Sequence, residues 1–219
     1  MGWFRPNIEQ MQGYAPGEQP QERGFIKLNT NESPYPPTPA VLRALRAAAT
    51  KDVRLYPDPM ANAVRRAASE VFGLPVGRIL AGNGSDDLLT MILRAVVGPG
   101  RTLAYPVPTY TLYRTLAQIE NARAREVPFP PDFRLPRGLF RRGDAATIVA
   151  NPNSPTGTAV SNAELSRLAR AIGGLLVVDE AYADFADEHA LSLVERHRNV
   201  IVLRTFSKSF SLCGVRLGL

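Results

Sequence analysis

Apolar side chains recur along this chain at two spacings, which predict two kinds of element. Spacings of three and four residues, which place apolar groups on one side of a helix, predict helices over residues 38–48, 61–72 and 86–97. Short apolar runs instead predict buried strands, and these lie at residues 147–150, 175–179 and 200–203.

The two patterns alternate through the rest of the sequence. Further strands are predicted at 78–81, 102–105 and 123–127, and further helices at 109–119 and 161–172. Helices between apolar strands indicate an α/β domain with a mostly parallel sheet. We therefore expect one such domain over residues 38–219.

Residues 1–37 show no sustained periodicity. They predict an N-terminal arm with one short strand at 25–28.

Composition narrows the class of protein. The 219 residues are 45% hydrophobic and 21% charged, which is typical of a globular chain. The single cysteine, Cys213, excludes an internal disulfide and favours a reducing compartment. No apolar run is long enough for a membrane span and the N-terminus lacks an apolar leader, so we expect a cytoplasmic protein without membrane contact.

The net charge of +6 points to phosphate rather than to nucleic acid. The 26 lysines and arginines of the chain are dispersed, with no run of five. A surface that binds nucleic acid instead gathers basic residues on one face. Anionic small molecules are the better expectation, and no nucleic-acid partner and no metal are expected.

Four motifs follow predicted strands, at the edge of a parallel sheet where ligands collect. Residues 82–86, Gly-Asn-Gly-Ser-Asp, precede a helix, so their backbone N–H groups could bind a phosphate or simply form a turn. Residues 151–157 follow the predicted strand at 147–150. They could take part in a ligand site or simply form a proline-stiffened turn before a helix. Asp179 ends a buried strand, with Tyr182 three residues later, and could hold a positive charge in a dry cleft.

The fourth motif spans residues 205–218. Lys208 stands among hydroxyl side chains, with Arg216 eight residues later, a pattern that predicts an amine beside a phosphate clamp. An amine, an acid and a phosphate cup are what pyridoxal phosphate requires of a protein.

The sequence resembles the fold-type I pyridoxal-phosphate aminotransferases, and within them the histidinol-phosphate aminotransferases. The motifs that carry the resemblance occur in the family's order and cover nearly the whole chain. They are residues 28–32, 55–58, 82–86, 108–113, 151–157, 178–182 and 207–216.

The resemblance implies a three-layer α/β/α sandwich that binds pyridoxal 5′-phosphate. In it Lys208 forms the Schiff base and then shuttles a proton, Asp179 pairs with the ring nitrogen, and Tyr182 binds the ring oxygen. Tyr110 stacks on the ring, whereas Tyr113 is expected to pack in the core. The phosphate is held by Gly84, Ser85, Asp86, Thr205, Ser207 and Arg216.

Three further roles come from the resemblance. Tyr14 and Asn29 are expected to bind the substrate, Tyr14 through its phosphate, and Tyr56 to reach the cofactor of a neighbouring subunit in a homodimer. Where many relatives have the asparagine that meets the ring oxygen, this chain has Ser154, so that role passes to Asn153.

The implied reaction is amino exchange between L-histidinol phosphate and 2-oxoglutarate. The shared motifs also fit an aromatic aminotransferase or a threonine-phosphate decarboxylase. Family members continue past residue 218 into a small domain with an arginine for the substrate carboxylate, so truncation is expected. The 219 residues alone are expected to be inactive, and a non-catalytic cofactor-binding fragment stays an alternative.

Overall fold

The structure is a computed structural model that describes residues 2–12 and 24–219. Its centre is a five-stranded sheet in the order β2-β1-β3-β4-β5, in which every neighbouring pair is parallel. The strands are β1 (Thr102–Val107), β2 (Arg123–Pro128), β3 (Ala146–Ala150), β4 (Leu175–Asp179) and β5 (Val200–Leu203).

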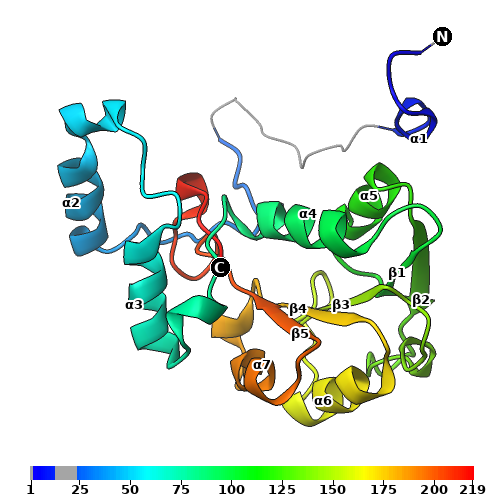
Figure 1. The fold of residues 1–219 in the computed structure, drawn as a ribbon. Coiled ribbons are helices and arrows are strands. Elements are labelled where there is room, and N and C mark those ends of the chain that lie inside the picture. The colour runs from blue at the N-terminus through cyan, green and yellow to red at the C-terminus, as the bar shows by residue number, and fades with distance from the viewer. Residues whose placement is uncertain (1, 13–23) are drawn as a thin grey trace.

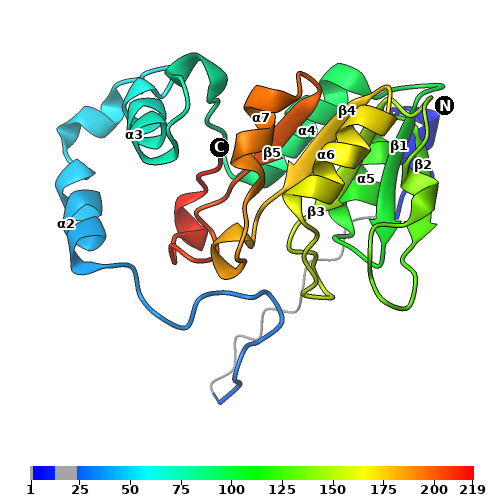
Figure 2. The ribbon, with the colours of Figure 1, turned by 90° about the horizontal axis from the view of Figure 1, so that it is seen from below.

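Helices cover both faces of the sheet and make three layers, which confirms the expected fold class (Figure 2). Helices α4 (Ser85–Val96) and α5 (Leu112–Ile119) pack on one face. Helices α6 (Asn162–Ala171) and α7 (Leu193–Arg196) pack on the other.

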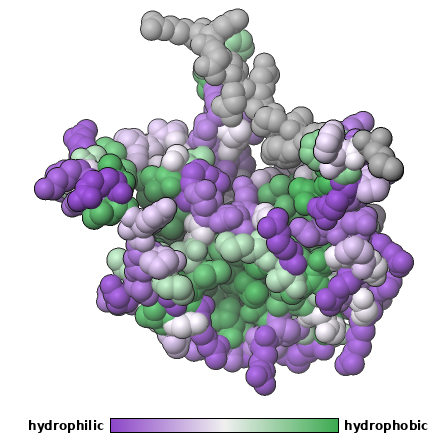
Figure 3. All heavy atoms as spheres, turned by 45° about the horizontal axis from the view of Figure 1, so that its top comes forward, coloured by the Kyte–Doolittle hydropathy of each residue, from purple (hydrophilic) through white to green (hydrophobic). Residues whose placement is uncertain are grey.

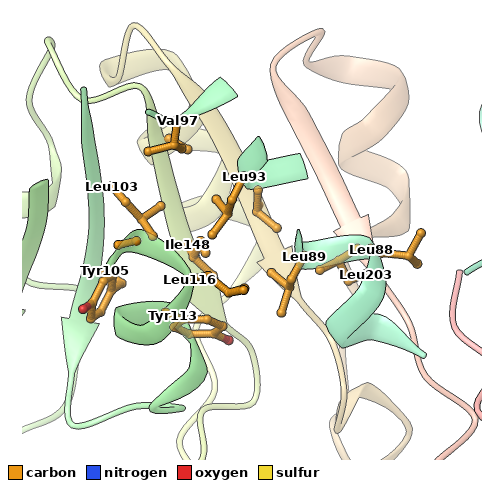
Figure 4. Close-up of a cluster of buried hydrophobic side chains, with 13 residues drawn as sticks. Leu88, Leu89, Leu93, Val97, Leu103, Tyr105, Tyr113, Leu116, Ile148 and Leu203 are labelled. Carbon is orange, nitrogen blue, oxygen red and sulfur yellow. The ribbon is translucent and has the colours of Figure 1, made fainter. Parts of the chain in front are cut away.

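The two faces are separated by the alternation of side chains within each strand. In β1, Leu103 and Tyr105 face α4 and α5, whereas Ala104 between them faces α6. The first cluster gathers leucines of α4 around Ile148 of β3 (Figure 4). Because both faces are covered, the central strands are apolar throughout, which explains their continuous hydrophobic runs.

Helices α1, α2 and α3 precede α4 in the chain. Helix α1 (Pro6–Glu9) is anchored to the end of α5, where Arg5 and Asn7 donate to backbone carbonyls of residues 118 and 119. Helix α2 (Pro39–Ala48) projects away from the sheet and buries no residue (Figure 1). Helix α3 (Asn62–Phe72) ends at Gly73 in a left-handed conformation, the expected stop.

The short connections are single 3₁₀ turns. They span Lys51–Arg54, Val76–Arg78, Arg137–Leu139, Ala183–Phe185, Ala190–Ser192 and Cys213–Val215. Within the described ranges, no helix is long and apolar enough to cross a membrane.

Two strand predictions are wrong. The predicted strand at 78–81 is a 3₁₀ turn followed by extended chain, and only Gly82 makes a bridge, to Gly218. Residues 25–28 form no strand, none of the described residues pairs with them, and their apolar side chains are exposed. In both segments the apolar run is present, but the described part of the chain offers no partner strand along most of its length.

The other predicted elements are confirmed within a few residues. The largest shift is in α5, which begins at Leu112 rather than at Thr109. Residues 109–111 turn instead, and the Thr109 hydroxyl donates to the amide oxygen of Asn153, 2.7 Å away. At the start of α6, the Ser161 hydroxyl accepts from the Glu164 N–H, as the sequence predicts.

Candidate active site

A cavity of about 420 Å³, here called the strand-end cavity, opens at the carboxyl ends of β3, β4 and β5. Side chains after each strand line it, together with residues 29–32 of the N-terminal arm. Most of the predicted site residues line this cavity: Asn29, Ser85, Asp86, Tyr110, Asp179, Tyr182, Thr205, Ser207, Lys208 and Arg216.

The first turn of α4 forms one wall. Gly84 immediately precedes this helix with φ +89°, a conformation that L side chains rarely adopt. A Cβ at Gly84 would lie 2.7 Å from the Arg216 guanidinium, so the glycine lets that side chain approach the helix N-terminus. Unpaired N–H groups and the helix dipole there favour an anion.

Hydroxyl groups and a guanidinium form the adjoining wall. Arg216 donates to the Ser207 hydroxyl at 3.3 Å and lies 3.8 Å from the Asp86 carboxylate. Thr205 in turn donates to Ser207 at 3.0 Å. Arg216, Thr205 and Ser207, with the backbone N–H groups of Ser85 and Asp86, make a compact set of donors at the α4 N-terminus, here called the anion cup, which suits a phosphate group.

Asp179 ends β4 at the floor of the cavity and is 5% exposed. Its Oδ2 accepts from the Tyr113 hydroxyl at 2.6 Å, and its Oδ1 accepts from the Ala181 N–H at 3.2 Å. Burial raises the pKa of Asp179, while these two donors act in the opposite direction. The same burial, with Asp179 beside it, raises the pKa of Tyr113 well above its ordinary value.

Lys208 and Tyr182 form the side of the cavity that faces the arm. The Lys208 amine lies 5.6 Å from the centre of the Tyr182 ring and donates to the Thr30 carbonyl at 2.8 Å. The Tyr182 hydroxyl accepts from the Asn31 amide at 2.9 Å. The arm is therefore tied to two of the three residues predicted to be catalytic.

Glu180, the residue after Asp179, takes no part in the cavity. It is 2% exposed and its carboxylate accepts from Arg204, 3.1 Å away, and from the Ala190 N–H. Arg204 also pairs with Asp184 at 2.5 Å. This network fixes the end of β5 just before the segment that carries Lys208.

Tyr110 and Tyr113 meet edge to face, with ring centres 5.7 Å apart. The Tyr110 hydroxyl also lies 3.4 Å from the Asp86 carboxylate. An aromatic ring at this cavity wall can offer a face to a planar ligand.

Three predicted residues do not line the cavity: Asn153, Gly84 and Tyr56. Asn153 is 3% exposed, and its amide donates to the Pro108 carbonyl and the Thr156 hydroxyl. It therefore joins its own loop to the loop after β1, and Ser154 lines the cavity instead. Tyr56 is fully exposed. Tyr14 lies outside the described residues, so its predicted role stays a prediction.

Sequence reasoning missed three partners of the site: Tyr113, Thr30 and Asn31. Tyr113 is buried in the core, as expected, but its hydroxyl also reaches Asp179. The predicted helix over 109–119 placed Tyr113 on the same face as Tyr110, and this could have indicated that Tyr113 also lies near the site. Thr30 and Asn31 lie within the 28–32 motif, in which only Asn29 was singled out.

A second hollow, of about 500 Å³, lies beside the free edge of β5 and is here called the edge groove. Mainly apolar side chains line it, from α4, β5 and the segment around residues 74–80; they include Ile79, Leu80, Met91, Val202 and Leu219. Figure 3 shows apolar side chains gathered in the lower middle of the face that it draws. Five titratable residues, Arg78, Glu195, His197, Arg198 and Arg204, also line the edge groove, but no lysine and no aspartate is among its lining residues.

Within the described part of the chain, no group of three or more His, Cys, Asp or Glu residues could hold a metal ion. The chemistry available at the strand-end cavity is therefore an amine, a buried carboxylate, aromatic rings and an anion cup.

The names of known proteins that are similar to this chain agree with the groups that line the strand-end cavity. The chain is 49% identical over 219 residues to histidinol-phosphate aminotransferase 1 of Trichormus variabilis, covering 99% of this chain and 62% of that protein. It is 49% identical to the Rhodopirellula baltica histidinol-phosphate aminotransferase, covering 98% of this chain and 60% of the relative.

A solved structure gives the same result. The Sinorhizobium meliloti histidinol-phosphate aminotransferase in complex with pyridoxal-5′-phosphate aligns with a TM-score of 0.83 and 29% identity, covering 100% of this chain and 62% of that one. This chain thus spans 60–62% of the length of these three relatives. Residues 23–219 match the family model "Aminotransferase class I and II", and the chain belongs to that family.

Proposed function

We propose that this chain binds pyridoxal 5′-phosphate in the strand-end cavity and supplies the cofactor site of a transaminase that acts on L-histidinol phosphate, with the 219 residues inactive on their own. One observation carries the proposal: Lys208, Asp179 and the anion cup around Arg216 line the same cavity. The names of the relatives, and the cofactor bound in the S. meliloti protein, support it.

The residues present fit this cofactor. A pyridine ring bearing an aldehyde and a phosphate needs an amine, an acid for its nitrogen and donors for its phosphate. The absent Cβ of Gly84 leaves room for the guanidinium at the α4 N-terminus, where the phosphate would bind. The volume of about 420 Å³ lies within the usual range for small-molecule sites.

When bound, the cofactor supplies an electron sink for charge that develops on the substrate carbon. Asp179 would hold a proton on the ring nitrogen, because a buried carboxylate favours an adjacent positive charge. Tyr182 would donate to or accept from the ring oxygen. Lys208 would bind the aldehyde carbon and then carry the proton to and from the substrate carbon.

The arm would close the substrate side of the cavity. The hydrogen bond from Lys208 to the Thr30 carbonyl holds the reactive amine beside the arm. Asn29 lines the same side and is our proposed substrate contact, as is Tyr14, which lies outside the described residues.

Covalent capture tests the cofactor site. The chain is incubated with pyridoxal phosphate, reduced with borohydride and mapped by mass spectrometry. The sequence has three lysines, Lys27, Lys51 and Lys208, and we expect the added mass on Lys208. Lys208→Ala should lose it, whereas Lys51→Ala, a change at an exposed lysine, should keep it. Capture that is equal at all three lysines would contradict the proposal.

Substrate choice needs a separate assay. Glutamate formation from 2-oxoglutarate is measured with L-histidinol phosphate, phenylalanine or threonine phosphate as the second substrate, on this chain and on the longest form of the protein. Preference for histidinol phosphate supports the proposal. Preference for phenylalanine would indicate an aromatic aminotransferase, and release of carbon dioxide from threonine phosphate a decarboxylase.

We also propose a homodimer. Tyr56 is fully exposed and α2 buries no residue, so this outlying part of the chain offers unpartnered surface to a second copy (Figure 1). In the dimer Tyr56 would reach the partner's phosphate site. Sedimentation velocity measures the state, and Tyr56→Phe should weaken cofactor binding without dissociating the dimer.

A further inference from the structure

We propose that Tyr113 is a positioning residue for Asp179: its hydroxyl fixes the plane of the carboxylate and keeps it in the ionised form that the cofactor ring requires. That Asp179 serves a cofactor ring rests on the proposed function. The contact between Tyr113 and Asp179 is a feature of the structure itself.

The contact is short and shielded. Tyr113 is 0% exposed and Asp179 is 5% exposed, and their oxygens lie 2.6 Å apart. Each carboxylate oxygen accepts one hydrogen bond, Oδ2 from Tyr113 and Oδ1 from the Ala181 N–H. With one donor on each oxygen, the carboxylate cannot rotate without breaking a bond.

The role of the hydroxyl follows from the charges around Asp179. Burial favours the protonated acid, and Asp86 on α4 adds a repulsive negative charge. Hydrogen-bond donors to the carboxylate oppose both effects. Tyr110, Lys208 and Arg216 also face the cavity, but Lys208 donates to the Thr30 carbonyl and Arg216 to the Ser207 hydroxyl rather than to Asp179. Tyr113 is therefore the side-chain donor that offsets the burial of Asp179.

The hydroxyl of Tyr113 is itself suited to donate. Its pKa is raised by burial and by Asp179, so it keeps its proton over the working range of pH. The proton consequently stays on the phenol and the negative charge on the carboxylate, which is the arrangement that can hold a protonated ring nitrogen.

The test is the titration of Asp179 in the cofactor-free chain, followed by carbon-13 NMR of labelled aspartate and assigned with Asp179→Asn. In Tyr113→Phe we expect the midpoint to rise by about one unit or more, since the carboxylate loses a donor. A second readout is the dissociation constant for pyridoxal phosphate at neutral pH, which should rise about tenfold in Tyr113→Phe.

The chain contains a matched control. Tyr105 is 2% exposed and lies 5.8 Å from the Tyr113 ring, and its hydroxyl bonds to Glu126 instead of Asp179. Tyr105→Phe removes the same atom from the same core, so a purely structural effect would appear in both variants. A rise that is equal in both, or absent from Tyr113→Phe, overturns the inference.

A third variant keeps the test decisive if Tyr113→Phe does not fold. Replacing Tyr113 by 3-fluorotyrosine makes the phenol a stronger donor and should lower the Asp179 midpoint; an unchanged midpoint overturns the inference. The titration needs no cofactor. Failure of the unaltered chain to bind pyridoxal phosphate would count against the proposed function, while the Asp179 midpoint would still decide the role of Tyr113.

Discussion

The strand-end cavity and the edge groove have similar volumes, about 420 and 500 Å³, yet they are built in opposite ways. The strand-end cavity is lined by side chains that hold one another by hydrogen bonds, such as Tyr113 with Asp179 and Arg216 with Ser207. The edge groove is lined mainly by aliphatic side chains beside a strand with a free edge.

The difference shows that volume alone does not locate a site. The larger hollow offers mainly apolar contact, with a few charged side chains in its lining, whereas the smaller brings an amine, a buried carboxylate and phosphate donors together. The parallel sheet produces this result because it delivers the ends of β3, β4 and β5 to one edge.

The largest effect that we predict is on the free energy of unfolding. It compares the loss of a side chain from the packed core beneath α4 with the loss of one that lines the edge groove. Leu89 is 0% exposed and Leu80 is 54% exposed. Leu89→Ala should lower the free energy of unfolding by about 3 kcal/mol, because it leaves a cavity in a close-packed core. Leu80→Ala should cost less than about 1 kcal/mol. Urea unfolding measures both, and equal losses would mean that the groove is as well packed as the core.

The second prediction concerns the anion cup at the α4 N-terminus. Gly84→Ala should destabilise the chain by about 1–3 kcal/mol, because alanine strains a backbone with φ +89° and its Cβ meets Arg216. Cofactor binding should weaken as the guanidinium is displaced. Gly77→Ala is the control, since nothing lies within 4 Å of its Cβ and its φ is ordinary. If both variants behave alike, the close approach at Gly84 is not needed.

The third prediction sets function against stability at Asp179. Its pKa is raised by burial, so just above the unfolded value of about 3.9 the folded state binds more protons than the unfolded state. Stability therefore falls as pH rises through that window and stays lower at neutral pH. Asp179→Asn should match the unaltered chain below about pH 3.5 and exceed it at pH 7 by about 1 kcal/mol.

Urea midpoints measured between pH 3 and 7 check this sign. The same variant should lose cofactor affinity, since an amide cannot carry the negative charge. A variant that is less stable at pH 7 would show that the donors from Tyr113 and Ala181 more than offset the burial.

The smallest effect concerns the groove alone. An apolar fluorescent dye such as ANS should bind the edge groove, and Leu80→Glu, a change at a lining residue that is 54% exposed, should lower its fluorescence while changing the free energy of unfolding by only about 0.5 kcal/mol. Cofactor capture at Lys208 should not change. Dye binding that survives Leu80→Glu but is displaced by pyridoxal phosphate would place the dye in the other cavity.

Much of the fold follows from local sequence, because periodicity records which faces are buried. The runs at β3, β4 and β5 and the Ser161 cap of α6 are of this kind. The segment 78–81 carries an equally apolar pattern, but a strand also needs a neighbour, and a neighbour is decided by residues distant in sequence.

The site divides in the same way. Asp179, Lys208 and Arg216 could be predicted because each follows a strand or stands in a dense motif. The bond from Tyr113 to Asp179 joins a helix to a strand far along the chain, and the Asn153 amide is turned toward Pro108 in the loop after β1. Side-chain direction in a loop depends on three-dimensional contacts, so the sequence alone could place these residues near the site but not orient them.

Gly218 bridges both Gly82 and Thr205, and a Cβ at Gly218 would lie 2.5 Å from the backbone of Gly84 and Ser85. These contacts join segments that are far apart in the chain, so closing them costs more loop entropy than forming any single helix. In folding, the sheet and its helices should therefore form first and the anion cup last. Mutations near Gly218 would then change how fast the protein becomes competent to bind its ligand more than how fast it collapses.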